Sequence, residues 1–485
     1  MSVRKSLAQS FMTKYIVLIV QFAATMVLAR ILTPSEIGIY AIAAVVAGLT
    51  QVLREFGIGQ FIVQEKVLTR DKIRAAFTIS LGLNWLVGGL LYLLTDVVAN
   101  FYQQPGIADV LSVLVVTFII SPIASIPVAL MRRHMQFDKI MRIEVLSAIA
   151  HAITGVTTAL MGESYMALGW ASLAGVTVTL LAAIILRPPE ATFIPGFAKV
   201  SDVASYGAIA GGAALIGQIS FQIPSLVIGK ALTMHAVGIF GKALSTIMLF
   251  NKVIVEGLVP VFLSHFAKAH REGKNLTEAY FYVVSCLTAI SWPFFLFMAV
   301  NAEHLVLLLY GNQWFEAVSI IQLMCVSMIV FSFTSLVEHI FTAIGQIKEV
   351  LRLQIFTSIT RIVCVVTAAP FGLEMIALAL IAVPVLRLFL IFPKLKQHMA
   401  ISVTDHGPFL KLCFFTTLPC AMLLAGQLFL SHMVELHYML MLAISGVCYS
   451  LTWLGAIFYF NHPIKKEVES ICQSLLGKYT GSRQP

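Results

Sequence analysis

The sequence predicts an all-α integral membrane protein with about fourteen transmembrane helices, and three observations support this fold class. Hydrophobic residues make up 59% of the 485 residues and charged residues only 11%, too few to cover the surface of a water-soluble fold of this size. Apolar runs of about 20 residues, enough to cross about 30 Å of hydrocarbon as a helix, recur along the chain. One short segment also occurs twice, which indicates a duplicated half.

The apolar runs follow one another from Phe11 to Phe460 with only short interruptions. A short basic stretch without a small-residue cleavage site precedes the first run, so we expect a retained helix and not a signal peptide. The predicted spans are 11–31, 37–57, 75–95, 106–126, 143–162, 165–187, 205–229, 236–258, 281–300, 316–337, 353–372, 374–393, 408–430 and 438–460.

The duplicated segment reads ARILTPSEIGIYAIA at residues 29–43 and GKALTMHAVGIFGKA at 229–243. A generic tight hairpin between membrane helices would also explain either copy alone. Thr33-Pro34-Ser35-Glu36 resembles an N-cap sequence, and the shared glycines favour close approach of helices. The identical pairs are Leu32/Leu232, Thr33/Thr233, Gly38/Gly238, Ile39/Ile239 and Ala43/Ala243.

The spacing of the two copies predicts the domain organisation. Six spans separate them, and an even number returns the chain to the same side of the membrane, so the halves are parallel repeats. We expect six-helix bundles over residues 1–200 and 201–400, meeting at a central cavity with alternating access. Residues 401–462 then supply two additional helices, and 463–485 form a cytoplasmic tail.

The distribution of basic residues predicts the orientation. Lys/Arg-rich connections alternate with connections such as TDVVANFYQQPG and MGESY that contain neither residue. By the positive-inside rule both termini are cytoplasmic, and the net charge of +9 is mainly a topology signal. Contact with anionic membrane lipid is a secondary effect, and nucleic acid is not an expected partner. The basic connections include Arg4, Lys5, Lys66, Arg70, Lys72, Arg74, Arg132, Arg133, Lys139, Arg142, Lys268, Arg271, Lys274, Lys465 and Lys466.

Patterns typical of enzymes are missing from the sequence. There is no nucleophile elbow, no phosphate-binding glycine loop with its lysine, and no His/Cys cluster with metal-ligand spacing. Six of the seven cysteines fall inside predicted spans, so we expect packing residues and no disulfides. The sequence therefore predicts neither an enzyme nor a cofactor, and transport would depend on gradients or on the charge of the substrate.

Charged residues at bilayer depth predict the ligand. Each such residue needs a partner or a water-filled cavity, and here basic residues outnumber acidic ones. Of the deep acids, only Glu256 and Glu338 clearly sit within or against a span, each near its cytoplasmic end, and Glu256 is spaced to pair with Lys252 at i,i+4. The net positive charge favours an anionic ligand. The basic residues away from the cytoplasmic connections are Arg30, Lys230, Lys242, Lys252, Arg361, Arg387 and Lys411.

Depth separates these basic residues into groups. Arg30 and Lys230 lie at the outer ends of their spans, where snorkelling to the interface competes with a cavity role, and Lys411 is expected to anchor a cytoplasmic end. Lys242, Arg361 and Arg387 lie a third to halfway along their helices, so we expect them to face a cationic cavity. With no acid evident beside Arg361 or Arg387, alanine at either should impair transport and leave the protein folded.

Four segments resemble a known family. They are 29–42, REFGIGQFIVQEKVLTRDKI at 54–73, ALMRRHMQFDKIMRIE at 129–144 and LVLLLYGNQWFEAVSIIQLMCV at 305–326. The sequence resembles the polysaccharide-transporter (Wzx-like) oligosaccharide flippases of the multidrug/oligosaccharidyl-lipid/polysaccharide (MOP) exporter superfamily.

The resemblance implies two helix bundles in the bacterial inner membrane and export of undecaprenyl-diphosphate-linked oligosaccharide repeat units to the periplasmic leaflet. A polysaccharide polymerase and a chain-length regulator are then possible partners. Because basic residues on the corresponding helices of lipid II flippases grip the diphosphate, the resemblance adds Arg54 to the candidates and supports Lys252, although no motif matches at either position.

Two other functions stay open on the sequence alone. A cation-coupled multidrug exporter of the same fold would favour deep carboxylates, whereas the deep excess here is basic. A membrane polysaccharide polymerase or ligase would usually need a large outer domain, and the longest predicted outer loop has only about fifteen residues.

Overall fold

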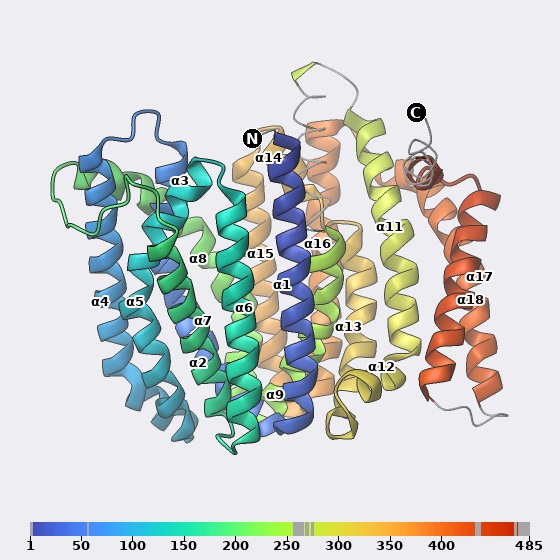
Figure 1. Cartoon of the computed structure of the whole chain (residues 1–485). Coiled ribbons are helices and arrows are strands. Elements are labelled where there is room, and N and C mark those ends of the chain that lie inside the picture. Colours follow the sequence, from blue (N-terminus) through green and yellow to red (C-terminus); the bar gives the residue numbers. More distant parts are fainter. Residues whose placement is uncertain are drawn as a thin grey trace, which may run out of the picture. The chain divides into compact units, whose positions relative to one another are not determined.

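The computed structural model describes residues 3–55, 58–255, 276–431 and 438–469, together with residues 266, 271, 272 and 473. Over these residues the chain is helical and contains no strand (Figure 1). The chain divides into two compact units, Met1–Gly241 and Lys242–Pro485, and the boundary falls within one helix. The predicted bundles over residues 1–200 and 201–400 are the two copies of a duplicated sequence and need not coincide with these compact units. That division stays a prediction.

The first unit is a bundle of long helices. Within it α6 packs against α7 and α1, and α5 packs against α4 and α7. The helices are α1 (Val3–Ile31), α2 (Pro34–Glu55), α3 (Ile58–Gln64), α4 (Arg70–Tyr102), α5 (Gly106–Arg133), α6 (Phe137–Leu160), α7 (Met166–Ile185), α8 (Val200–Ala231) and the first part of α9 (Met234–Phe250).

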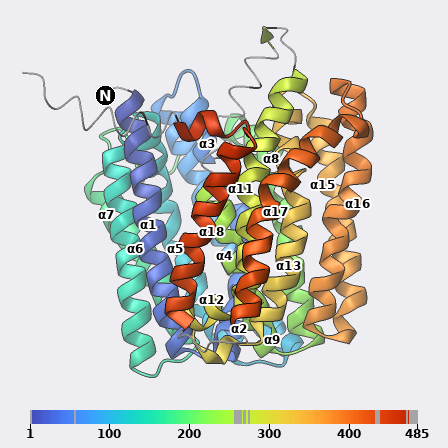
Figure 2. The ribbon, with the colours of Figure 1, turned by 90° about the vertical axis from the view of Figure 1, so that its right-hand side faces the viewer.

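The second unit contains the remaining helices. Here α13 packs against α11 and α16, and α17 runs beside α11 and α18 (Figure 2). Its elements are the end of α9, the π-helix η1 (Asn251–Val255), α11 (Leu276–Val300), α12 (Ala302–Leu309), η2 (Asn312–Trp314), α13 (Ala317–Ser332), α14 (Val337–Ala343), α15 (Ile347–Ala368), η3 (Ala369–Phe371), α16 (Leu373–Met399), η4 (Val403–Asp405), α17 (His406–Ser431) and α18 (Tyr438–Tyr459).

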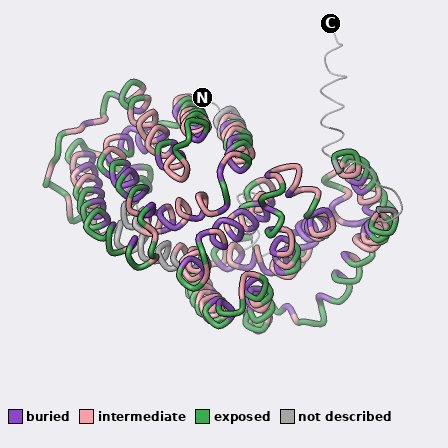
Figure 3. Tube along the Cα trace, turned by 90° about the horizontal axis from the view of Figure 1, so that it is seen from below, coloured by how far each residue is buried: buried purple, intermediate pink, exposed green. Residues whose placement is uncertain are grey.

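The predicted membrane fold class is confirmed. Each of the fourteen predicted spans coincides with a helix, and within the described residues twelve helices are long and apolar enough to cross a membrane. The apolar part of α2, Pro34–Leu49, is shorter. Exposed residues alternate with buried ones along the same helices (Figure 3), and many of the exposed ones are large and apolar, as hydrocarbon requires.

The two copies of the duplicated segment have the same backbone design. The last residues of α1 and α8, Ile31 and Ala231, lie 200 positions apart, and so do the first residues of α2 and α9. At the start of α2, the Thr33 hydroxyl accepts a hydrogen bond from the Glu36 amide at 3.3 Å, and the Glu36 carboxylate accepts one from the Thr33 amide at 2.7 Å. This capping box confirms the predicted N-cap. Thr233 caps α9 in the same way, accepting from the Ala236 amide at 3.1 Å.

The two copies also contact each other within the first unit. A Cβ atom added to Gly38 would lie 1.8 Å from the carbonyl oxygen of Met234, and one added to Gly238 would lie 2.0 Å from the carbonyl oxygen of Pro34. Each glycine therefore packs directly against the first residue of the other copy's helix. Only a residue without a side chain permits this approach, so the predicted role of the glycines in close helix packing is confirmed.

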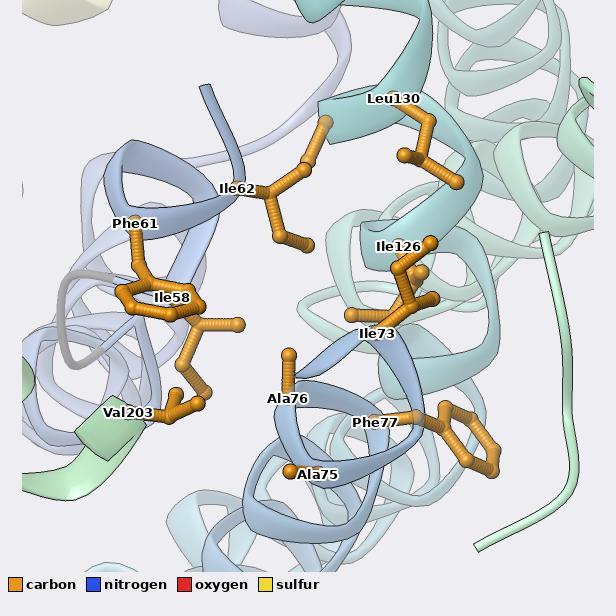
Figure 4. Close-up of a cluster of buried hydrophobic side chains, with 11 residues drawn as sticks. Ile58, Phe61, Ile62, Ile73, Ala75, Ala76, Phe77, Ile126, Leu130 and Val203 are labelled. Carbon is orange, nitrogen blue, oxygen red and sulfur yellow. The ribbon is translucent and has the colours of Figure 1, made fainter. Parts of the chain in front are cut away.

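A buried cluster holds the short helix α3 in place. Side chains from α3, α4, α5 and α8 meet in this cluster, including Phe61, Ile62 and Leu130 (Figure 4). The guanidinium of Arg133 donates hydrogen bonds of 2.7 Å to the carbonyls of Ile62 and Glu65 at the end of α3. These bonds join two of the segments that resemble the polysaccharide transporters, and they satisfy carbonyls that the helix end leaves free.

In two helices of the second unit, a side chain donates a hydrogen bond to the backbone carbonyl that a proline leaves without its helical partner. Proline lacks an N–H, so the carbonyl four residues before it loses its helical partner. Before Pro293 of α11 that carbonyl belongs to Ala289, and it accepts a 2.7 Å hydrogen bond from the indole of Trp453. Before Pro384 of α16 it belongs to Leu380, and it accepts a 3.3 Å bond from the hydroxyl of Ser327. The bond from Trp453 attaches α18, the last of the predicted additional helices, to α11.

Candidate functional site

A cluster of charges lies among α14, α15 and α16 in the second unit. Arg387 of α16 is only 4% exposed, and its Nη2 lies 2.9 Å from a carboxylate oxygen of Glu338 on α14. The same nitrogen donates to the carbonyl oxygen of Thr334 at 3.3 Å. Arg361 of α15 lies within electrostatic range of both members of this pair. We call Arg361, Arg387 and Glu338 the charge cluster; it carries two guanidiniums and one carboxylate.

The Arg387 guanidinium is held firmly but is not saturated with acceptors. Its central carbon lies 5.1 Å from the centre of the Phe331 ring, a distance at which a cation–π contact is favourable. Its Nε is buried and has no hydrogen-bond partner within the described part of the chain. A guanidinium presents five N–H donors in a planar fork, so Arg387 retains donor capacity for a further acceptor.

The prediction that Arg387 carries an uncompensated charge is wrong. Glu338 compensates it, and a break in the tenth predicted span explains why the sequence did not reveal this. Helix α13 ends at Ser332, a turn follows, and the new helix α14 brings Glu338 to Arg387. A carboxylate expected near the cytoplasmic end of a continuous helix thus lies against a guanidinium halfway along another one.

Lys242 of α9 occupies a different environment within the second unit. The side chain is buried, and its ammonium lies 4.8 Å from the centre of the Tyr310 ring and 4.9 Å from that of Trp314. The hydroxyls of Tyr310 and Thr246 are hydrogen-bonded at 2.9 Å, which fixes the first ring against α9. Lys242 therefore binds to the Tyr-Gly-Asn-Gln-Trp loop between α12 and α13, a contact that the sequence pattern did not reveal.

Replacing Trp314 with leucine should destabilise the wild-type background more than the Lys242→Met background. In the wild-type background the substitution removes one aromatic face from a buried ammonium, a contact that contributes about 2 kcal/mol when desolvated. In the Lys242→Met background no charge needs that face. Thermal unfolding of the four purified proteins in detergent measures the coupling, and equal losses in both backgrounds would show that the aromatic faces do not stabilise the charge.

The other predicted site residues are placed separately. Lys230 is exposed, and its ammonium donates to the carbonyl of Phe101 at 2.6 Å and lies 4.3 Å from the ring of the same residue, which favours an anchoring role. Arg30 is exposed at the end of α1. Lys252 is exposed in η1, and its predicted partner Glu256 lies outside the described residues. The side chain of Arg54 on α2 is also outside them.

Among the described residues of the second unit, the arrangement brings together Arg361 and Arg387 from the predicted set. The sequence did not single out Phe331 or Thr334, which position Arg387, nor the partnership of Glu338 with it. Their separation along the chain carries no helical periodicity that could have revealed them. Within the described residues, no group of three or more His, Cys, Asp or Glu side chains is arranged to hold a metal ion.

The chain is similar to known polysaccharide biosynthesis proteins. A family model described as "Polysaccharide biosynthesis protein" matches residues 27–319. The lipopolysaccharide biosynthesis protein WzxC of Escherichia coli (strain K12) is 23% identical over 81% of each chain, and the teichuronic acid biosynthesis protein TuaB of Bacillus subtilis (strain 168) is 22% identical over 67% of each.

The fold of this chain is similar to that of a solved membrane protein structure. The lipid II flippase MurJ, in an inward closed conformation, superposes with a TM-score of 0.73 over 94% of this chain and 99% of MurJ, at 10% identity. The prediction of the family from the four resembling segments is thus confirmed: the chain belongs to the polysaccharide biosynthesis protein family.

Proposed function

We propose that the protein is a flippase that moves undecaprenyl-diphosphate-linked oligosaccharide repeat units from the cytoplasmic to the periplasmic leaflet by alternating access. Family membership and the MurJ-like fold support a lipid-linked oligosaccharide as the transported molecule. The charge cluster is the observation that carries the proposal for this chain, because its two guanidiniums inside a helix bundle suit an anionic diphosphate.

Chemistry and energetics agree with this assignment. A guanidinium binds two oxygens of a phosphate with its planar fork, which a point charge cannot do. The membrane potential is negative inside, so outward movement of the anionic diphosphate is electrically downhill. The gain is about 2.3 kcal/mol per charge per 100 mV if the charge crosses the whole field. The substrate can thus supply part of its own driving force.

The rival functions are less well supported by the same site. A multidrug exporter for organic cations would favour carboxylates in its cavity, and the carboxylate of the charge cluster is already paired with Arg387. A polymerase or ligase would need a group that activates an acceptor hydroxyl. The charge cluster offers two guanidiniums and one carboxylate, and that carboxylate is already paired with Arg387. A polymerase and a chain-length regulator are therefore proposed as partners of the flippase, and polymerisation is not proposed as its own activity.

Arg361→Ala should lower the rate at which lipid-linked repeat units reach the outer leaflet at least tenfold. A hydrogen bond to a charged group contributes about 1.5–3 kcal/mol, and Arg361→Lys should be intermediate because the charge survives without the fork. The leaflet distribution of repeat units in spheroplasts measures the effect. Lys411→Ala, which alters an exposed lysine of α17, is the control and should be silent.

The outcome also separates the alternatives. Loss of the protein should leave repeat units in the cytoplasmic leaflet. Repeat units that reach the outer face but stay unpolymerised would indicate a polymerase instead. Full export by Arg361→Ala at normal protein level would remove the charge cluster from the transport path.

We propose that both termini are cytoplasmic, as the basic connections suggest. A cysteine replacing exposed Asn100, near the end of α4, should react with an impermeant thiol reagent from outside intact spheroplasts. A cysteine replacing exposed Val67, between α3 and α4, should react only after permeabilisation. Both variants need a background without reactive native cysteines, and labelling of Val67→Cys from outside would reverse the assigned orientation.

A further inference from the structure

We propose that Glu338 is a built-in competing counter-ion, which occupies on Arg387 the place that an anionic group of the substrate takes during transport. The inference rests on the proposed function and adds a role for the one carboxylate of the charge cluster. In the empty protein Glu338 pairs with Arg387; substrate displaces it; and after release the pair forms again.

The two partners differ in their freedom to separate. The side chain of Arg387 is 5% exposed and that of Glu338 is 23% exposed. Arg387 is further fixed by the carbonyl of Thr334 and the ring of Phe331. The carboxylate is therefore the member that can withdraw, whereas the guanidinium stays in place to receive another anion.

The existing ion pair uses little of what Arg387 can offer. Glu338 contacts the guanidinium through one oxygen and Nη2, and that nitrogen is shared with the Thr334 carbonyl. The buried Nε has no acceptor among the residues that the structure describes. A phosphate that accepted hydrogen bonds from Nε and Nη2 together would form the stronger bidentate contact. Arg361, which interacts electrostatically with both partners, adds attraction for a group that carries more negative charge than one carboxylate.

Alternating access gives this competition a purpose. After release of the substrate the carrier must return empty, and a buried guanidinium without a counter-ion is costly in a low-dielectric interior. Glu338 neutralises the charge of Arg387 during that return. The same carboxylate competes with the substrate for Arg387, so the ion pair lowers the affinity for substrate and speeds the return of the empty carrier.

The test measures binding and transport in Glu338→Gln, which keeps the size of the side chain and removes its charge. Purified protein in nanodiscs should bind undecaprenyl diphosphate about tenfold more tightly than the wild type. In proteoliposomes, net flipping of a labelled lipid-linked oligosaccharide should slow at least fivefold, while exchange of labelled for unlabelled substrate across the membrane should persist. Glu374→Gln, which removes an exposed carboxylate from the start of α16, is the matched control and should change neither.

A second variant covers poor folding of the first. Glu338→Asp shortens the side chain by one methylene and weakens the contact, so binding should tighten by a smaller factor. If the wild type binds undecaprenyl diphosphate and either variant binds it no more tightly, the pair is a structural ion pair and the inference is overturned. If the wild type neither binds this lipid nor flips the lipid-linked oligosaccharide, the proposed function itself is wrong.

Discussion

Gly238→Ala should lower the free energy of unfolding by about 3 kcal/mol and reduce export of polymer at least tenfold. The new methyl group would lie 2.0 Å from the backbone oxygen of Pro34, where ordinary contact begins near 3.4 Å. Backbone cannot rotate away as a side chain does, so α2 and α9 must separate. Gly38→Ala should have a similar effect, because its methyl group would lie 1.8 Å from the Met234 oxygen.

The same helix supplies a matched control for this prediction. A Cβ atom added to Gly241, three residues further along α9, would meet no atom of the described residues within 4 Å. Gly241→Ala should therefore leave the melting temperature unchanged or raise it, since alanine favours helix more than glycine does. Thermal unfolding in detergent and polymer output at matched protein level are the measurements. Equal stability of Gly238→Ala and Gly241→Ala would mean that the close contact is not needed.

Arg387→Ala should destabilise the protein by about 2 to 4 kcal/mol, because it leaves the Glu338 carboxylate without its partner in a largely buried site. The double variant Arg387→Leu/Glu338→Leu should recover most of that stability, since neither charge is left unpaired. It should not recover transport. Unfolding and flipping assays on the same preparations would therefore separate the structural role of the ion pair from the role of the guanidinium in binding.

An ion pair with an exposed arginine provides the comparison. Arg352 lies 2.8 Å from Glu349; the arginine side chain is 67% exposed, and Glu349 also pairs with Lys394 at 3.1 Å. Arg352→Ala should cost less than about 1 kcal/mol, because water screens the arginine and Glu349 keeps its second partner. A double Leu variant at Arg387 and Glu338 that exported polymer normally would contradict the assignment of Arg387 to the transport path.

Much of the fold could be predicted because it depends on local sequence. Apolar runs gave the positions of the helices, and Thr33 and Glu36 have the spacing of a capping box. The glycines of the duplicated segment indicated a close contact, but not that the two copies contact each other. Hydropathy reports the length of a membrane helix and says little about its neighbours.

The site was harder to predict because its contacts are not local. The helical spacing rule predicts a pair between Lys252 and Glu256, four residues apart, which stays a prediction, but Glu338 and Arg387 are on different helices. Depth within a span also misled, since the turn after α13 moves Glu338 away from the place that a continuous helix would give it. For Lys242, the basic charge was visible in the sequence and its aromatic partners were not.

The bond between Trp453 and Ala289 has a consequence for how the chain is made. The indole is encoded 164 residues after the carbonyl that needs it, which at about 5–20 residues per second is a delay of roughly 8–30 s during synthesis. An unsatisfied carbonyl in hydrocarbon costs several kcal/mol. Helix α11 can therefore settle fully into lipid only once α18 has been synthesised, and until then a wet or proteinaceous environment at the site of insertion must serve the carbonyl of Ala289.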